Sequence, residues 1–131
     1  MPATPMQPSV AGPISALLVG LGALPGAWLR FWLVRSLEPF LVRRHWGTLV
    51  VNLLACFALG LLVAHQARLP HRSHVMLLVG TGFLGSLSTF SSFASELRLC
   101  LQQGERVEAA GLLLASTLGG LLALRAGWIL F

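Results

Sequence analysis

Four long stretches of apolar residues, separated by short polar segments, dominate the hydropathy pattern of the chain. They cover about residues 14–34, 46–64, 75–95 and 107–131, and none holds more than two charged residues. A helix rises about 1.5 Å per residue, so 19–21 residues reach across the roughly 30 Å of bilayer hydrocarbon. The pattern predicts an all-α membrane protein with four transmembrane helices, forming a single domain over residues 14–131.

The segment before the first apolar stretch has a different character. Residues 1–13 contain Pro2, Pro5, Pro8 and Pro13 and show no helical periodicity, which predicts a disordered N-terminal tail. The basic residues that open a secretory signal peptide are missing from this segment, so we do not expect a cleaved signal.

Composition narrows the class of protein further. Of the 131 residues, 56% are hydrophobic and 10% are charged, against about 25% charged in ordinary soluble domains. No set of nucleophile, base and orienting group can be assembled, so an enzyme is not expected. The net charge of +5 comes from nine arginines scattered at the ends of the apolar stretches, without the basic, aromatic-interleaved patch that nucleic-acid binding needs.

The arginines also bear on orientation in the membrane. In a four-span chain, the loops after the first and third spans lie on one side, and the central loop lies on the other side with both termini. Cytoplasmic loops normally carry the excess of arginine, and here the excess is small, so the chain is compatible with insertion in both orientations. Five arginines fall on the first side and three on the second: Arg35, Arg43, Arg44, Arg98 and Arg106, against Arg68, Arg72 and Arg125.

The third span is unusual for a lipid-facing helix. Residues 80–85 hold three glycines, and five hydroxyl residues follow between Ser86 and Ser92. Such a stretch predicts a helix broken at mid-membrane, and irregular backbone at that depth must be buried in protein or face an ion or water. Freed backbone carbonyls are natural ligands of a cation.

Beyond this stretch, helical spacing places Thr89, Ser92, Phe93 and Glu96 on one stripe, with Phe90 beside it. Two interpretations are open. The hydroxyls could bond to carbonyls of their own helix while the phenylalanines fill space, or the cluster could line a pathway.

Three other polar residues lie in or near the spans. Asn52 is an amide inside the second span, where it either joins helices or lines a pathway. Arg30 and Glu96 are the ionisable residues nearest the spans, and each could form an interfacial salt bridge or contact lipid. No carboxylate lies in the core of any span, so amide and hydroxyl donors with positive phenylalanine ring edges favour a small anion over a cation.

The chain resembles the CrcB/Fluc family of fluoride channels over essentially its whole length apart from the tail. The matching segments are residues 22–30 (GALPGAWLR), 47–52 (GTLVVN) and 85–93 (GSLSTFSSF), the last resembling the family's G-G-L-T-T-F-S-T-F. Ser86, Ser88 and Ser92 depart from that motif, and the last two keep a hydroxyl. Ala23 and Pro25 depart from the family's G-G-x-x-G pattern in span one.

The resemblance implies a passive fluoride-selective channel, built as an antiparallel dual-topology homodimer with two pores. The channel would lie in the plasma (inner) membrane and lower the fluoride concentration of the cytoplasm. Its partners would be fluoride, the lipid bilayer and a second copy of the same chain. The implied fluoride pathway takes in Asn52, Phe90, Phe93, Thr89, Ser92 and, as a weaker match, Ser116. Gly85 and Ser88 would offer carbonyls to a structural sodium ion at the dimer interface, and Arg30 and Glu96 match further family positions.

Two other functions remain open at this point. A small multidrug-resistance-type transporter also has four spans and dimerises, but it needs a membrane-embedded carboxylate for proton coupling, and Glu96 is the one candidate. A structural membrane subunit without transport activity would give no ion flux in liposomes.

Overall fold

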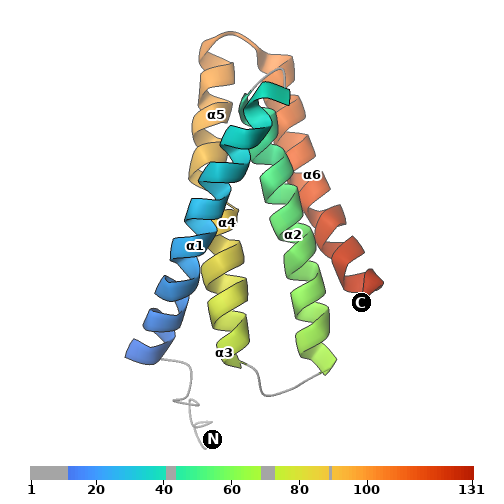
Figure 1. Cartoon of the computed structure of the whole chain (residues 1–131). Helices are drawn as coiled ribbons and strands as arrows, with labels where there is room; N and C mark the ends of the chain where they lie inside the picture. Colours follow the sequence, from blue (N-terminus) through green and yellow to red (C-terminus); the bar gives the residue numbers. More distant parts are fainter. Residues whose placement is uncertain (1–11, 41–43, 69–72, 89) are drawn as a thin grey trace, which may run out of the picture.

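The computed structural model describes residues 12–40, 44–68, 73–88 and 90–131, and every regular element in those ranges is helical. The predicted tail therefore lies, apart from Gly12 and Pro13, outside the described residues. The chain forms a bundle of long helices joined at alternating ends (Figure 1). In chain order the elements are α1 (Pro13–Leu37), η1 (Glu38–Phe40), α2 (Arg44–Arg68), α3 (Ser73–Val75), η2 (Met76–Leu84), α4 (Gly85–Leu87), α5 (Phe90–Gln102) and α6 (Arg106–Leu130).

Four of the helical segments are long and apolar enough to cross a membrane, which confirms the prediction made from the hydropathy pattern. They are Pro13–Phe40, Trp46–Arg68, Met76–Gln102 and Arg106–Leu130. The first continues through Pro25 without interruption, and that proline is exposed. A proline removes one backbone donor from a helix, a loss that neighbouring helices and local adjustments offset in membrane helices.

Glycines bring the helices together in two pairs. On α1, a Cβ at Gly22 or Gly26 would collide with backbone carbonyls of η2, at Leu78 and Phe83 respectively. Between α2 and α6, a Cβ at Gly60 would in the same way collide with the Leu124 carbonyl. Small residues at such positions let backbones approach closely, which is how helices associate in lipid.

The interior between these pairs is filled by two apolar clusters. One consists of Val51 and Ala55 from α2 with Leu84 and Leu87 from the third span. The other joins α2, α5 and α6, and its members are Leu49, Phe93 and Leu112. The second cluster fixes how α5 sits against α2 and therefore positions the polar groups described below.

The third span changes helical form along its length. The segment η2 is a π-helix, and the Gly85 N–H donates to the Gly80 carbonyl five residues back. Ser88, after the short α4, has extended backbone angles (φ −82°, ψ 144°), and α5 begins at Phe90. π-Helical turns are rare and are often found at functional sites.

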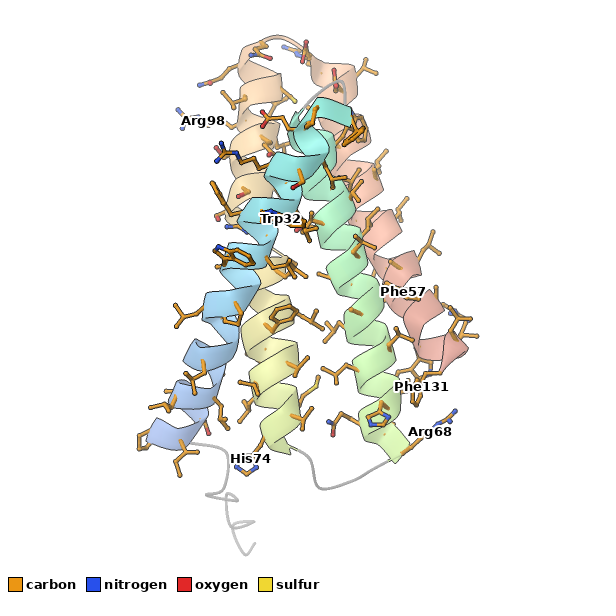
Figure 2. The ribbon with its side chains drawn as sticks, in the orientation of Figure 1. Trp32, Phe57, Arg68, His74, Arg98 and Phe131 are labelled. Carbon is orange, nitrogen blue, oxygen red and sulfur yellow. The ribbon has the colours of Figure 1, made fainter. Side chains whose placement is uncertain are left out.

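The outer faces of α1 and α6 remain strongly apolar. Leu24, Trp28 and Trp32 of α1 and Leu122 and Ile129 of α6 are all exposed, and Figure 2 shows Trp32 on the outer side of α1. A soluble protein rarely exposes so much apolar surface. These faces therefore require lipid or a second protein surface.

Candidate functional site

A hydrogen bond between α1 and α5 forms the first half of a polar cluster. Arg30 Nη1 donates to Ser92 Oγ at 2.9 Å, and both side chains are half-buried. A further nitrogen of the same guanidinium, Nε, is buried and has no hydrogen-bond partner among the described residues. The guanidinium therefore enters the bundle with more hydrogen-bond donors than the described protein groups accept.

The second half of the cluster joins α2 to α5. Thr48 Oγ1 donates to Glu96 Oε1 at 2.8 Å, and Thr48 is the buried polar residue of the described core, with 4% of its surface exposed. A hydrogen bond to a carboxylate is stronger than one between neutral groups. Glu96, which the sequence placed near a helix end, is thus tied to the neighbouring helix.

Both pairs face one cavity of about 510 Å³. Its lining residues on α1 and α2 belong to the C-terminal part of α1 and the N-terminal part of α2, which share one end of the bundle (Figure 1). Two arginines and two glutamates balance each other around it, and hydroxyl groups supply the remaining polar surface. Its charged and hydroxyl lining residues are Arg30, Arg35, Glu38, Thr48, Ser92, Ser95 and Glu96.

Asn52 lies one helical turn from Thr48, on the same face of α2. Ser92 lies one turn from Glu96 on α5, and α2 and α5 run in opposite directions (Figure 1). Because Thr48 meets Glu96, the antiparallel pairing brings Asn52 to about the depth of Ser92. Asn52 is half-buried and has an interaction partner in the protein.

The two phenylalanines of the predicted stripe differ sharply in environment. Their ring centroids are 5.8 Å apart and the ring planes make an angle of 51°. Phe93 is 9% exposed and packs in the cluster with Leu49 and Leu112, whereas Phe90 is 79% exposed. Phe93 therefore contributes to the core of this chain, and Phe90 presents an aromatic face beyond it.

Three further predicted site residues in the described ranges, Ser116, Gly85 and Ser88, do not line the cavity. Ser116 Oγ on α6 is buried and has no hydrogen-bond partner in the described part of the chain. Gly85 is exposed and Ser88 is half-buried at the junction of α4 and α5, and Thr89 lies outside the described residues. The structure thus brings together Arg30, Ser92 and Glu96, with Asn52 at a similar depth.

Sequence reasoning assigned no role to Thr48, although it lies in the matched segment 47–52. The signal was its position four residues before Asn52, on the same helical face. Arg35 and Glu38 were also missed as cavity residues, because their approach to α5 depends on how α1 packs.

Comparison with known proteins points to one family. A family model described as "CrcB-like protein, Camphor Resistance (CrcB)" matches residues 17–128. A protein of Prochlorococcus marinus named "Fluoride-specific ion channel FluC 1" is 52% identical over 115 residues, covering 86% of this chain and 88% of the relative.

Two further relatives extend the comparison. A protein of Parasynechococcus marenigrum, also named "Fluoride-specific ion channel FluC 1", is 50% identical over 86% of this chain and 90% of its own length. One from Gloeobacter violaceus, named "Fluoride-specific ion channel FluC", is 39% identical over 87% of this chain and 93% of the relative. The match over nearly the whole chain confirms the resemblance found in the sequence, and the protein belongs to the CrcB family.

Proposed function

We propose that this protein is a fluoride-selective channel that lets fluoride leave the cytoplasm passively, down its own gradient. The proposal rests on one observation. Two relatives named as fluoride-specific ion channels share 52% and 50% sequence identity with this protein over 86% of its chain. Membership of a channel family also sets the protein apart from enzymes. The relatives' names give no support to a multidrug transporter or a structural subunit.

The polar groups of the bundle support an anion as the transported species. Asn52 carries an amide that donates hydrogen bonds, and Ser92 carries a hydroxyl at the cavity, where two arginines balance two glutamates. Fluoride is small and accepts strong hydrogen bonds, so a line of such donors replaces its hydration shell better than that of a larger halide. The Glu96 carboxylate accepts a hydrogen bond from the Thr48 hydroxyl.

The pathway is completed, in our proposal, by an antiparallel homodimer of dual topology with two pores. Phe90 is 79% exposed although its ring lies next to that of the buried Phe93. The exposed Phe90 ring therefore offers a surface that a second copy of the chain could cover. The exposed apolar faces of α1 and α6 also accommodate a partner or lipid. The numbers of arginines expected on the two sides of the membrane, five and three, differ little, which is compatible with insertion of the chain in both orientations.

A structural sodium ion between the two copies is a further part of the proposal. Ser88 has extended backbone angles between α4 and α5, and we propose that the carbonyls of Gly85 and Ser88 supply oxygens to the ion at this point of the third span. Backbone carbonyls are ligands that suit a hard cation. Binding the ion would satisfy carbonyl oxygens that lipid cannot satisfy, since lipid tails donate no hydrogen bonds.

The membrane we propose is the plasma (inner) membrane. Fluoride enters a cell as its neutral acid and dissociates at cytoplasmic pH, so the anion accumulates inside. A passive fluoride pathway at that membrane would lower the cytoplasmic concentration without energy input.

The direct test is efflux from liposomes that contain the purified protein. Vesicles loaded with potassium fluoride and treated with a potassium ionophore are expected to release fluoride, and matched vesicles loaded with chloride are expected to retain it. Equal release of both halides would contradict selectivity, and no release of either would leave a structural subunit as the better account. Proton-driven uptake of a cationic drug that Glu96→Gln abolishes would favour the multidrug transporter instead.

A further inference from the structure

We propose that Arg30 is a positioning residue that fixes the Ser92 hydroxyl as a hydrogen-bond donor toward the permeating anion. The proposal rests on the proposed channel function and deepens it by giving the two residues unequal roles. It starts from the 2.9 Å contact between Arg30 Nη1 and Ser92 Oγ, which joins α1 to α5 at the wall of the cavity.

The direction of this hydrogen bond follows from the chemistry of the two groups. A guanidinium carries donors and no acceptor, so Ser92 Oγ must accept the bond from Arg30. A hydroxyl holds one proton and two lone pairs, so the Ser92 proton is left for a different partner. Since Ser92 lines the cavity, that proton is available to an anion there.

Thr48 shows the opposite arrangement at the same cavity. Its hydroxyl donates to Glu96 Oε1 at 2.8 Å, so its single proton is already engaged and its free lone pairs would repel an anion. The two hydroxyls therefore play opposite roles: Ser92 accepts a hydrogen bond from its charged partner, and Thr48 donates one to its charged partner. In each case the charged partner lies on another helix.

The positive charge does more than orient the hydroxyl. A bond from a charged donor polarises the O–H group it reaches, and chains of hydrogen bonds strengthen one another in a medium of low dielectric. Arg30 and Ser92 are both half-buried, which limits screening by water. Ser92 next to Arg30 is therefore a stronger donor than an isolated serine.

The position of Arg30 depends on how α1 is held against the third span. Gly26, one turn before Arg30, packs against the Phe83 carbonyl and Ser86. The Ser86 hydroxyl also donates to the Ala23 carbonyl of α1 at 3.0 Å. These contacts fix the helix that carries the guanidinium, so the bond to Ser92 is a feature of the packed bundle.

The test is a double-substitution cycle with fluoride efflux from liposomes as the readout. The variants are Arg30→Met, Ser92→Ala and the pair together, with Arg30→Lys as the version that keeps a charged donor. Arg98→Met is the matched control, because Arg98 is exposed and projects outward from α5 (Figure 2). Size-exclusion profiles and thermal unfolding of each variant show whether it is folded and keeps the oligomeric state of the unmodified protein.

We expect Arg30→Met to lower flux about tenfold or more, the size expected for a hydrogen bond to a charged group. We expect Arg30→Lys to retain more flux than Arg30→Met, and Arg98→Met to leave flux unchanged. In the Ser92→Ala background, Arg30→Met should lower flux less than about twofold further, because interactions within one network do not add. If Arg30→Met does not fold, Arg30→Gln replaces it under the same criteria.

The outcomes separate this proposal from the proposed function. If Arg30→Met lowers flux by the same factor in both backgrounds, its charge acts on the anion independently of Ser92 and the positioning role is wrong. The same conclusion follows if Arg30→Lys and Arg30→Met are equally impaired while both remain folded. If the unmodified protein releases no fluoride, the proposed channel function itself has failed.

Discussion

The Thr48 hydroxyl on α2 donates a hydrogen bond to the Glu96 carboxylate on α5, with 2.8 Å between the two oxygens. Thr48 is almost fully buried, so this bond forms away from bulk water. It holds the one carboxylate of the third span against the second helix, and the antiparallel pairing then brings Asn52 to about the depth of Ser92. The pair thus fixes both the position of a negative charge and the register of two helices.

The first prediction concerns this pair. Thr48→Val keeps the shape of the side chain but removes the hydrogen bond that Glu96 accepts, which is expected to cost about 1–2 kcal/mol of stability. Thr117→Val is the matched control, since the exposed Thr117 hydroxyl bonds to the Leu113 carbonyl of its own helix. Thermal unfolding of the detergent-solubilised protein measures both. Equal effects of the two substitutions would show that the bond to Glu96 contributes nothing particular.

The second prediction tests the packing of α1 against η2. A Cβ at Gly22 would collide with the Leu78 carbonyl, whereas a Cβ at Gly20 would meet no atom within 4 Å. Gly22→Ala is therefore expected to destabilise the protein by about 1–3 kcal/mol. Gly20→Ala is expected to be neutral or to stabilise it by up to about 1 kcal/mol, because alanine favours helix. Thermal unfolding of the two variants decides, and a stable Gly22→Ala would contradict the close approach of the helices.

The third prediction separates two roles of the phenylalanines. Phe93 is buried in the cluster with Leu49 and Leu112, so Phe93→Ala should cost about 3 kcal/mol of stability through the cavity it leaves. Phe90 is largely exposed in the single chain, and Phe90→Ile should leave the stability of the chain nearly unchanged. Phe90→Ile and Phe93→Ile should both lower fluoride flux strongly, because each removes positive ring edges and keeps an apolar side chain. Undiminished flux in both isoleucine variants would remove the phenylalanines from the pathway.

The fourth prediction concerns orientation in the membrane. In a background without Cys56 and Cys100, a single cysteine in the loop between the second and third spans should react with an impermeant thiol reagent from both sides of the membrane. Adding two lysines to one loop should favour a single orientation. When this variant is the sole protein in the liposomes, it should lose flux. Labelling from one side only, in the protein without added lysines, would contradict dual topology.

Much of the fold could be predicted from the sequence because the bilayer imposes a length on every apolar run. The second stretch was expected at about residues 46–64, and the helix that contains it is Arg44–Arg68. The helix extends further because His65 and Arg68 lie at its polar end, where hydropathy falls but backbone hydrogen bonds continue. The π-helical form of Met76–Leu84 had no signal in the hydropathy pattern, because apolar content alone does not select between helical types.

The candidate site could be predicted only in part. Ser92, Phe93 and Glu96 follow one another at helical spacing, so their common stripe on α5 was visible in the sequence. The partners of that stripe lie on other helices, more than 40 residues away, at Arg30 and Thr48. Which side chains meet depends on how glycine contacts set the helices against each other, and no local pattern encodes that arrangement.

The last prediction addresses the proposed sodium ion. Gly85 is exposed in the single chain, and a Cβ added there would lie 3.7 Å from the Gly80 carbonyl, an ordinary contact. A Cβ at Gly85 therefore causes no backbone clash within one copy. If Gly85→Val leaves the single chain folded, a loss of assembly would come from the contact between copies. Because the proposed ligands are backbone carbonyls, Ser88→Ala should retain the dimer and most of the flux, whereas the branched side chain of Gly85→Val should lower both.

Exhaustive exchange of sodium for a large organic cation during purification should have the same effect as Gly85→Val, and adding sodium back should restore flux. Light scattering gives the oligomeric state, and efflux from liposomes gives the flux. Thermal unfolding of Gly85→Val shows whether the single chain remains folded, which separates loss of assembly from misfolding. An unchanged dimer with full flux after complete sodium removal would contradict a structural role for the ion.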